Sequence, residues 1–227
     1  MEHTVTYPVM QHVTQPVNRA RYTAPDYVVE AYADRRSAIQ ARLQEFRAVP
    51  PTEWFYEFCY CLCTPQSKAV NAAEVVRLLK LQRFREQAFD PTHILRNPSH
   101  YIRFHNTKAK NLLHLHAVFA DIEQVLQTLS DVRAIRSHLV DTVRGMGMKE
   151  ASHVLRNIGY RGIAIIDRHI LTHLVRCSVI DTNAFPSTRV KYEEIEAKWL
   201  AFADDIRIDP DELDLLFWSL QTGEILK

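Results

Sequence analysis

The stretch VRGMGMKEASHVLRNIG, residues 143–159, is the most informative part of this sequence. The chain has only 5 glycines among 227 residues; three of them lie in this stretch, and Gly162 follows just beyond it. Gly145 and Gly147 flank the apolar Met146, where one helical pattern ends and the next begins. Because glycine tolerates a positive φ and a close backbone approach, the stretch predicts a tight turn between two helices.

The residues around this turn indicate what it binds. A helix N-terminus presents unpaired N–H groups and a partly positive dipole end, and such groups on a glycine turn bind phosphate. The small Ala151 and Ser152 let the second helix pack closely. This combination is typical of a helix-hairpin-helix, which holds a nucleic-acid backbone without reading bases, although most GxG turns only link helices. We therefore expect Gly145, Met146 and Gly147 to contact DNA, with Met146 also filling the core beneath the turn.

Lys149 lies in the first turn of the second helix. The helix dipole opposes added positive charge there, and a partly desolvated lysine in that position is a candidate amine nucleophile; most isolated lysines are simply solvated. Asp167 follows 18 residues later, after the apolar run of residues 163–166. We expect Asp167 to cap a helix, and its carboxylate could also stabilise a developing cation or transfer protons.

Composition and charge narrow the class of protein. Apolar residues make up 47% of the chain, as in a folded protein with a sizeable core. No run approaches the ~18 apolar residues of a membrane span, and the N-terminus lacks the pattern of a secretory signal. Net charge is +1, but residues 101–176 hold 11 basic and 6 acidic residues, whereas residues 177–227 hold 5 and 11. The glycine turn thus lies in the basic third, although ordinary patchiness of surface charge also gives such a pattern.

The four cysteines give no sign of a disulfide framework or a zinc site. Cys59, Cys61 and Cys63 alternate within one expected helix, where their side chains diverge, and Cys177 is remote from them. Zinc ligands and disulfide partners need convergent side chains. The cysteines therefore indicate reduced thiols in a cytoplasmic protein.

The chain is predicted to be mostly helical. Residues 1–24, with Pro8 and Pro16, show no helical period and are expected to form an extended or partly ordered arm. Apolar spacing predicts a buried helix over residues 52–63, one or two helices over 106–129, and a helix over 130–143 with Ser130 as its N-cap. The remaining predicted helices span residues 25–46, 67–82, 148–158, 168–177, 188–203 and 210–221.

Four strings together resemble a known family. They are FCYCLCTPQSKAVNA (58–72), GMGMKEASHVLRNIG (145–159), AIIDRHIL (164–171) and LDLLFWSLQTGEILK (213–227). The glycine turn, its lysine and the later aspartate resemble the helix-hairpin-helix DNA glycosylase superfamily, which includes endonuclease III. The fuller strings are similar to its type-2 8-oxoguanine DNA glycosylase/AP lyase family. The resemblance spans roughly residues 50–227 and leaves the arm uncovered.

The resemblance implies an all-α fold of two helical lobes with a DNA-binding cleft between them. Residues 63–169 would form a helical-barrel lobe ending in the helix-hairpin-helix. Residues 25–62 and 170–227 would form a second, discontinuous lobe. Endonuclease III carries an iron–sulfur cluster on C-terminal cysteines; here only Cys177 follows the hairpin, so neither a cluster nor any other metal or cofactor is expected.

The resemblance also implies a mechanism. Lys149 would attack C1′ of the damaged nucleoside, displace the base and form a Schiff base, and β-elimination would then nick the strand. Asp167 would stabilise charge at the sugar and assist proton transfer.

Further residues are expected around the base and the DNA. The base must leave the stack to be read, so Trp218 could be a stacking wall and Asp214, one helical turn earlier, could line the pocket; a core tryptophan is the alternative. Gln66 and Ser67 are candidates for a wedge or a minor-groove contact, or for ordinary helix capping. His169 could contact a phosphate or lie on the surface. The resemblance assigns Lys227 a part in telling 8-oxoguanine from guanine.

These observations predict a base-excision repair enzyme, a bifunctional DNA N-glycosylase and AP lyase, acting on double-stranded DNA that contains oxidised guanine. It is expected to be a cytoplasmic monomer, nucleoid-associated when bound to DNA, without a membrane partner. Two alternatives stay open. The same fold could act on oxidised pyrimidines, because the hairpin and lysine do not select the base, or the chain could be a non-catalytic helix-hairpin-helix DNA-binding protein.

Overall fold

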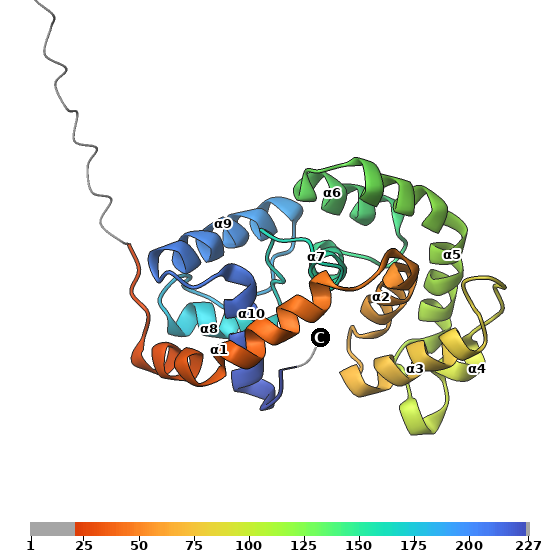
Figure 1. Cartoon of the computed structure of the whole chain (residues 1–227), viewed down its shortest axis with the longest axis horizontal. Helices are drawn as coiled ribbons and strands as arrows, with labels where there is room; N and C mark the ends of the chain where they lie inside the picture. The colour runs from red at the N-terminus through yellow and green to blue at the C-terminus, as the bar shows by residue number, and fades with distance from the viewer. Residues whose placement is uncertain (1–20, 226–227) are drawn as a thin grey trace, which may run out of the picture.

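The computed structural model describes residues 21–225, which contain helices and no strand (Figure 1). This confirms the predicted all-α class. The helices are α1 (Asp26–Arg47), α2 (Pro51–Cys63), α3 (Ala69–Leu81), α4 (Thr92–Leu95), the 3-10 helix η1 (Pro98–His100), α5 (His105–Thr128), α6 (Val132–Thr142), α7 (Met148–Asn157), α8 (Arg168–Arg176), α9 (Arg189–Asp205) and α10 (Pro210–Thr222). None of the helices among the described residues has the length and hydropathy needed to cross a membrane.

The predicted one or two helices over residues 106–129 are one continuous helix, α5. The structure differs from the sequence prediction in two local features. The first is the cap of α6, which is Asp131 rather than Ser130. The Asp131 carboxylate accepts from the N–H groups of the first helical turn, at 2.9 Å for Arg133. The short α4 and η1 were not predicted, because each begins next to a proline and is too short to show a hydrophobic period.

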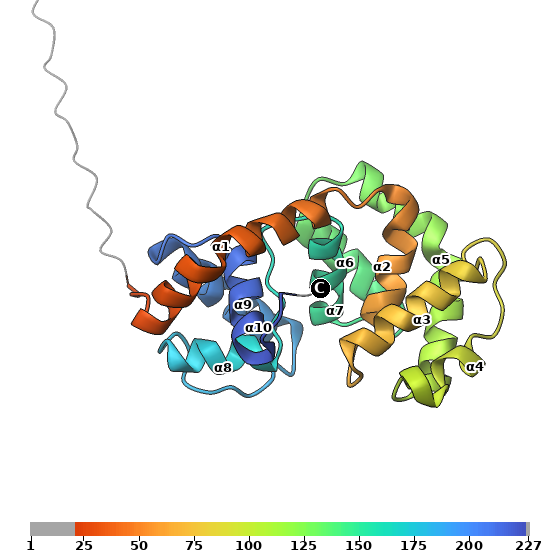
Figure 2. The same cartoon turned by 60° about the horizontal axis from the view of Figure 1, so that its bottom comes forward.

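The helices gather around two hydrophobic cores (Figures 1 and 2). The first core is built from α2, α3, α5, α6 and most of α7. The second is built from α1, α8, α9 and α10. Within the hairpin, Met146 belongs to the first core and Met148 to the second. The hairpin therefore joins the two cores.

Helix α2 packs differently from its predicted place. The sequence put residues 25–62 in the discontinuous lobe, yet α2 lies in the first core, against α3, α5 and α7. Nine of its 13 residues, from Phe55 to Cys63, are buried. A helix that is apolar on nearly every side must be surrounded, and only the first core surrounds it. The other predicted lobe boundaries remain a prediction.

Residues 1–20 of the predicted arm lie outside the described residues. The rest of it, residues 21–24, is non-helical. Its anchor is Asp205, whose Oδ2 accepts from the N–H groups of Arg21 at 2.8 Å and Tyr22 at 2.9 Å. The Tyr22 ring packs edge to face on Phe202. The four cysteines, all within the described residues, are buried and free.

Candidate active site

The glycine turn joins α6 to α7 as predicted. Gly145 has a φ of +81°, which favours glycine, and a Cβ there would lie 2.0 Å from Nδ2 of Asn111 on α5. Met146 is buried in the first core, and its N–H donates to the Val143 carbonyl at 3.1 Å. Met146 therefore fills the core beneath the turn, as expected. Gly145 and Gly147 are the exposed residues on either side of Met146, and their expected contact with DNA stays a prediction.

Lys149 lies in the first turn of α7, with 27% of its side chain exposed. Its Nζ is 3.2 Å from Oε1 of Glu150, and Oε2 of Glu150 accepts from the Gly147 N–H at 3.2 Å. The Glu150 carboxylate thus occupies the positive end of α7 and holds the lysine ammonium beside it. Glu150 is not among the predicted site residues, although a glutamate three residues after a helix cap is a known capping signal.

Asp167 caps α8, as the sequence predicted. Its Oδ1 accepts from the N–H groups of His169 at 2.8 Å and Ile170 at 2.9 Å. The preceding residues 163–166 are non-helical and buried, with Ile163 in the first core and Ala164 and Ile166 in the second. This segment leads to Asp167, which is half-buried at the start of α8.

Lys149 and Asp167 line one cleft of about 1080 Å³. The cleft also contains five other residues that the sequence singled out. They are Gln66, Ser67, His169, Asp214 and Trp218. The hairpin residues Gly145, Met146 and Gly147 do not line it, and Lys227 lies outside the described residues. Residues far apart in the chain, from the α2–α3 loop, α7, α8 and α10, are thus brought together around the candidate nucleophile.

Helix α10 presents Asp214 and Trp218, one turn apart, to the cleft. Nη1 of the buried Arg156 lies 3.4 Å from Oδ2 of Asp214, and the guanidinium also stacks 4.7 Å above the Phe46 ring. Burial raises the pKa of Asp214 to about 7. The charge of Arg156 lowers this pKa, and the charge of Asp167 raises it. The cleft therefore contains a carboxyl group that gains and loses its proton near neutral pH. Arg156 is not among the predicted site residues, because a lone arginine in an amphipathic helix has the sequence pattern of a surface residue.

The α2–α3 loop, residues 64–68, is held by a buried lysine. Nζ of Lys108 donates to the carbonyls of Cys63 at 2.7 Å and Pro65 at 2.6 Å, and to Oγ of Ser67 at 3.3 Å. Burial lowers the pKa of Lys108 to about 8, and Lys149 adds to that effect. The loop carries Gln66 in a left-handed conformation, with a φ of +55°, which costs a non-glycine residue on the order of 1 kcal/mol. The loop is therefore ordered by contacts that no local sequence signal reveals.

A second loop borders the cleft next to Gln66. The N–H of Arg103 donates to Oγ of Ser67 at 3.0 Å, and Arg103 lines the cleft. Phe104 also has a positive φ, +59°, and 51% of its surface is exposed. The Ser67 hydroxyl is thus bound within the protein. Gln66 and Phe104 are exposed at this edge, with the Arg103 guanidinium 4.9 Å above the Phe104 ring.

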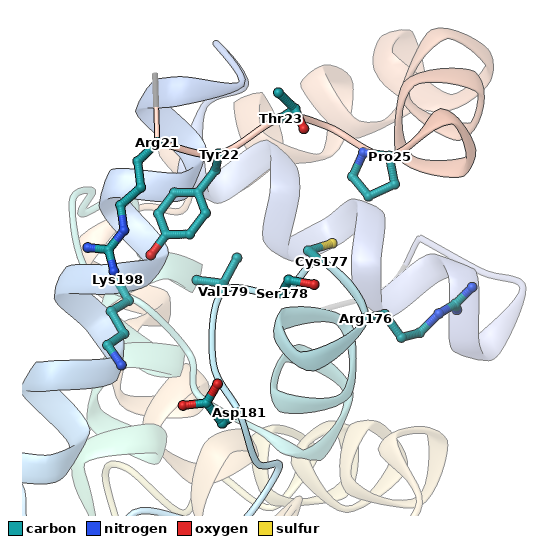
Figure 3. A pocket seen from close by; sticks show the side chains of 10 residues that line it. All are labelled: Arg21, Tyr22, Thr23, Pro25, Arg176, Cys177, Ser178, Val179, Asp181 and Lys198. Atoms are coloured by element: carbon teal, nitrogen blue, oxygen red, sulfur yellow. The ribbon is translucent and has the colours of Figure 1, made fainter. Parts of the chain in front are cut away.

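A second depression, of about 630 Å³, contains none of the predicted site residues (Figure 3). It lies between residues 21–25, the end of α8 and α9. Figure 3 shows Arg21, Arg176 and Lys198 around it, with Asp181 as its carboxylate. Lys149, Asp167 and Trp218 of the cleft do not line it.

Comparison with known proteins places these features in a family. A family model described as 8-oxoguanine DNA glycosylase matches residues 39–208. The chain is 34% identical over 212 residues to an 8-oxoguanine DNA glycosylase/AP lyase of Fusobacterium nucleatum, covering 88% of this chain and 96% of that protein. It is also 34% identical over 198 residues to one of Methanocaldococcus jannaschii, covering 85% and 93%.

A solved structure of an 8-oxoguanine glycosylase/lyase also matches this chain. The 8-oxoguanine glycosylase/lyase of Methanocaldococcus jannaschii, in complex with a 15mer DNA containing 8-oxoguanine, matches with a TM-score of 0.76 and 30% identity. The match covers 88% of this chain and 100% of that one. The chain therefore belongs to the 8-oxoguanine DNA glycosylase family.

Proposed function

We propose that this protein removes 8-oxoguanine from duplex DNA and then cleaves the strand at the abasic site. The observation that carries the proposal is the cleft in which Lys149, Asp167, Asp214 and Trp218 meet. The family adds the reaction class, because the relatives are named glycosylase/AP lyases. A DNA-binding module without catalysis would not need a half-buried lysine and an aspartate in the lining of one cleft.

Lys149 is the proposed nucleophile. Its uncharged amine attacks C1′, the bond from C1′ to the base breaks, and the base departs with the bonding electron pair and takes up a proton. The bond between C1′ and the ring oxygen then breaks, which opens the sugar ring and gives a protonated Schiff base. Removal of a proton from C2′ expels the 3′ oxygen as phosphate, which nicks the strand. Glu150, 3.2 Å from Nζ, holds the ammonium in the resting enzyme.

Asp167 acts on the sugar in this proposal. Its two hydrogen bonds from N–H groups of α8 hold the carboxylate still, and a fixed negative charge stabilises the positive charge that develops on the sugar as the base departs. It can also carry the proton that Lys149 must lose.

The pocket between Trp218 and Asp214 is the proposed place for the extruded base. A purine stacks on an indole ring, and a carboxyl group reads the edge of the base by hydrogen bonds. Lesion and guanine differ at N7, which is a donor in 8-oxoguanine and an acceptor in guanine. A buried group that pairs with one and opposes the other is an effective discriminator.

Covalent trapping tests the proposal. Borohydride added during reaction with 8-oxoguanine duplex should reduce the Schiff base and link the wild-type protein to DNA. Lys149→Gln should abolish the adduct and bind the duplex nearly as well, whereas Lys191→Gln, a change at an exposed lysine of α9, should trap like the wild type. An adduct of undiminished yield from Lys149→Gln would refute the assignment, and a duplex containing an oxidised pyrimidine would show which base is preferred.

A further inference from the structure

A buried polar cluster outside the lining of the cleft joins three helices. It consists of Arg136 on α6, Ser152 on α7, and Tyr192 and Glu196 on α9. All four side chains are at most 4% exposed. Buried polar groups are costly unless they are hydrogen-bonded, so the contacts of this cluster indicate what it is for.

The centre of the buried polar cluster is an ion pair. The Arg136 guanidinium binds both carboxylate oxygens of Glu196, with Nη2 2.8 Å from Oε2. Its Nη1 also donates to Oγ of Ser152 at 3.2 Å, and the guanidinium lies 5.6 Å from the centre of the Tyr192 ring. The ion pair thus connects the hairpin helices α6 and α7 to α9. A hydrophobic replacement of similar volume would often serve stability as well.

The same cluster binds the backbone of the non-helical segment before Asp167, residues 163–166. Oε1 of Glu196 accepts from the Ala164 N–H at 2.7 Å. The Tyr192 hydroxyl donates to the Ala164 carbonyl at 2.8 Å and accepts from the Ile166 N–H at 3.0 Å. Buried backbone groups outside helices and strands need such partners. Side chains of α9 supply them here.

The two ends of this network lie close in the chain to the two candidate catalytic residues. Ser152 lies one turn of α7 beyond Lys149, and Ile166 directly precedes Asp167. We propose that the buried polar cluster sets the spacing between Lys149 and Asp167, with Tyr192 as a positioning residue for Asp167; this rests on the function proposed above. The cluster reaches Asp167 through the backbone of residues 164–166 and touches no substrate itself.

Positioning of this kind matters because a displacement of about 1 Å costs on the order of 10²-fold in rate. A merely structural cluster predicts something different: its loss would lower the melting temperature and leave the rate of the folded enzyme unchanged. The rate of base excision per folded molecule therefore separates the two roles.

Tyr192→Phe is the sharpest change, because it keeps the ring and removes only the hydroxyl that binds Ala164 and Ile166. The matched control is Tyr160→Phe, which removes a hydroxyl that donates to the Leu126 carbonyl at 2.7 Å, away from the cleft. Under single-turnover conditions, well below the lowest melting temperature, Tyr192→Phe should excise 8-oxoguanine about 10-fold more slowly or worse. Tyr160→Phe should excise at the wild-type rate, and both variants should bind duplex DNA as the wild type does.

A double variant, Tyr192→Phe with Asp167→Asn, tests whether Tyr192 acts through Asp167. If Tyr192 acts through Asp167, Tyr192→Phe should slow excision in the wild-type background and cause no further loss when Asp167→Asn is already present. Wild-type rates in Tyr192→Phe, or losses that multiply in the double variant, would overturn the inference. Failure of the wild-type enzyme to excise 8-oxoguanine would instead refute the proposed function, and this inference with it.

Discussion

Lys149 and Asp167 share a local environment that suits their proposed chemistry. Each lies at the N-terminal end of a helix, Lys149 on α7 and Asp167 on α8. The Glu150 carboxylate occupies the positive end of α7 beside Lys149, and the Asp167 carboxylate occupies that of α8. Both hydrogen bonds to Asp167 end on Oδ1, which leaves Oδ2 for the sugar.

Asp167→Asn should separate capping from catalysis. The amide oxygen can accept the same N–H groups as Oδ1, because asparagine caps helices about as well as aspartate. The melting temperature should therefore barely move, while single-turnover excision of 8-oxoguanine falls by ~10²-fold, the scale of a lost acid–base group. A variant that melts early yet retains full activity per folded molecule would make Asp167 a structural cap only.

Asp214→Asn should change how stability depends on pH. The folded protein keeps the Asp214 proton up to about pH 7, whereas the unfolded chain loses it near pH 4. Between these values the folded state binds more protons, so the free energy of unfolding contributed by this group falls as pH rises. The stability of the wild type relative to Asp214→Asn should drop from about pH 4 to about pH 7, by at most ~1.4 kcal/mol per unit.

Urea unfolding of both proteins at several pH values measures this difference. The neighbouring Asp211, whose pKa burial raises to about 6, is present in both proteins, so its contribution largely cancels. A difference that stays constant over this range would show that Asp214 is ionised throughout.

The individual residues could be predicted only where the sequence carries a local signal. Lys149 and Asp167 follow from the glycine turn, the helix starts and the family strings. Lys108 and Arg156 could not be found that way: each depends on partners from remote segments, Cys63 and Pro65 for the first and Asp214 for the second. Lys108 is 45 residues from Cys63 in the chain. Spacing along a helix says nothing about such contacts.

At the scale of the helices, prediction succeeded where the hydrophobic period is long. Helices α1, α5 and α9 begin and end within a few residues of their predicted bounds. It failed for α4, a single turn whose stability comes from burying Ile94 and Leu95. It also misplaced α2, because its uniform apolar surface shows that it is buried but not which core buries it. Those outcomes depend on tertiary packing.

Gly145→Ala tests the hairpin turn as a unit. The added Cβ meets two penalties, the positive φ and the 2.0 Å approach to Asn111. Gly162→Ala is the matched control, because Gly162 has nearly the same φ, +83°, with nothing within 4 Å of the added Cβ. We expect the control to lose about 1 kcal/mol in the free energy of unfolding and Gly145→Ala to lose ~1–3 kcal/mol more.

Chemical denaturation of the two variants gives both values. Equal losses would mean that Asn111 moves aside freely and that the close approach of α5 to the turn is unimportant.

At the scale of the whole molecule, the cleft is formed where the two cores meet. The cleft is lined by the α2–α3 loop, which follows α2 of the first core, and by α8 and α10 of the second core. In addition to Lys149, three exposed cationic side chains line the cleft. They are Lys68, Arg103 and Arg168. The net charge of the chain is only +1, yet these exposed cations are close together in the cleft. Such a group of positive charges attracts a DNA backbone.

The salt dependence of DNA binding should locate this surface. Each neutralised phosphate contributes about −0.9 to the slope of log K against log salt, so four contacts weaken binding ~10²-fold between 50 and 200 mM. Arg103→Ala should make the slope shallower by about 0.9. Lys198→Ala should leave it unchanged, because Lys198 is an exposed cation of the other depression (Figure 3). Titration of undamaged duplex at four salt concentrations measures each slope. The reverse result, a shallower slope for Lys198→Ala and none for Arg103→Ala, would place the DNA across the other depression and separate binding from the cleft that holds Lys149.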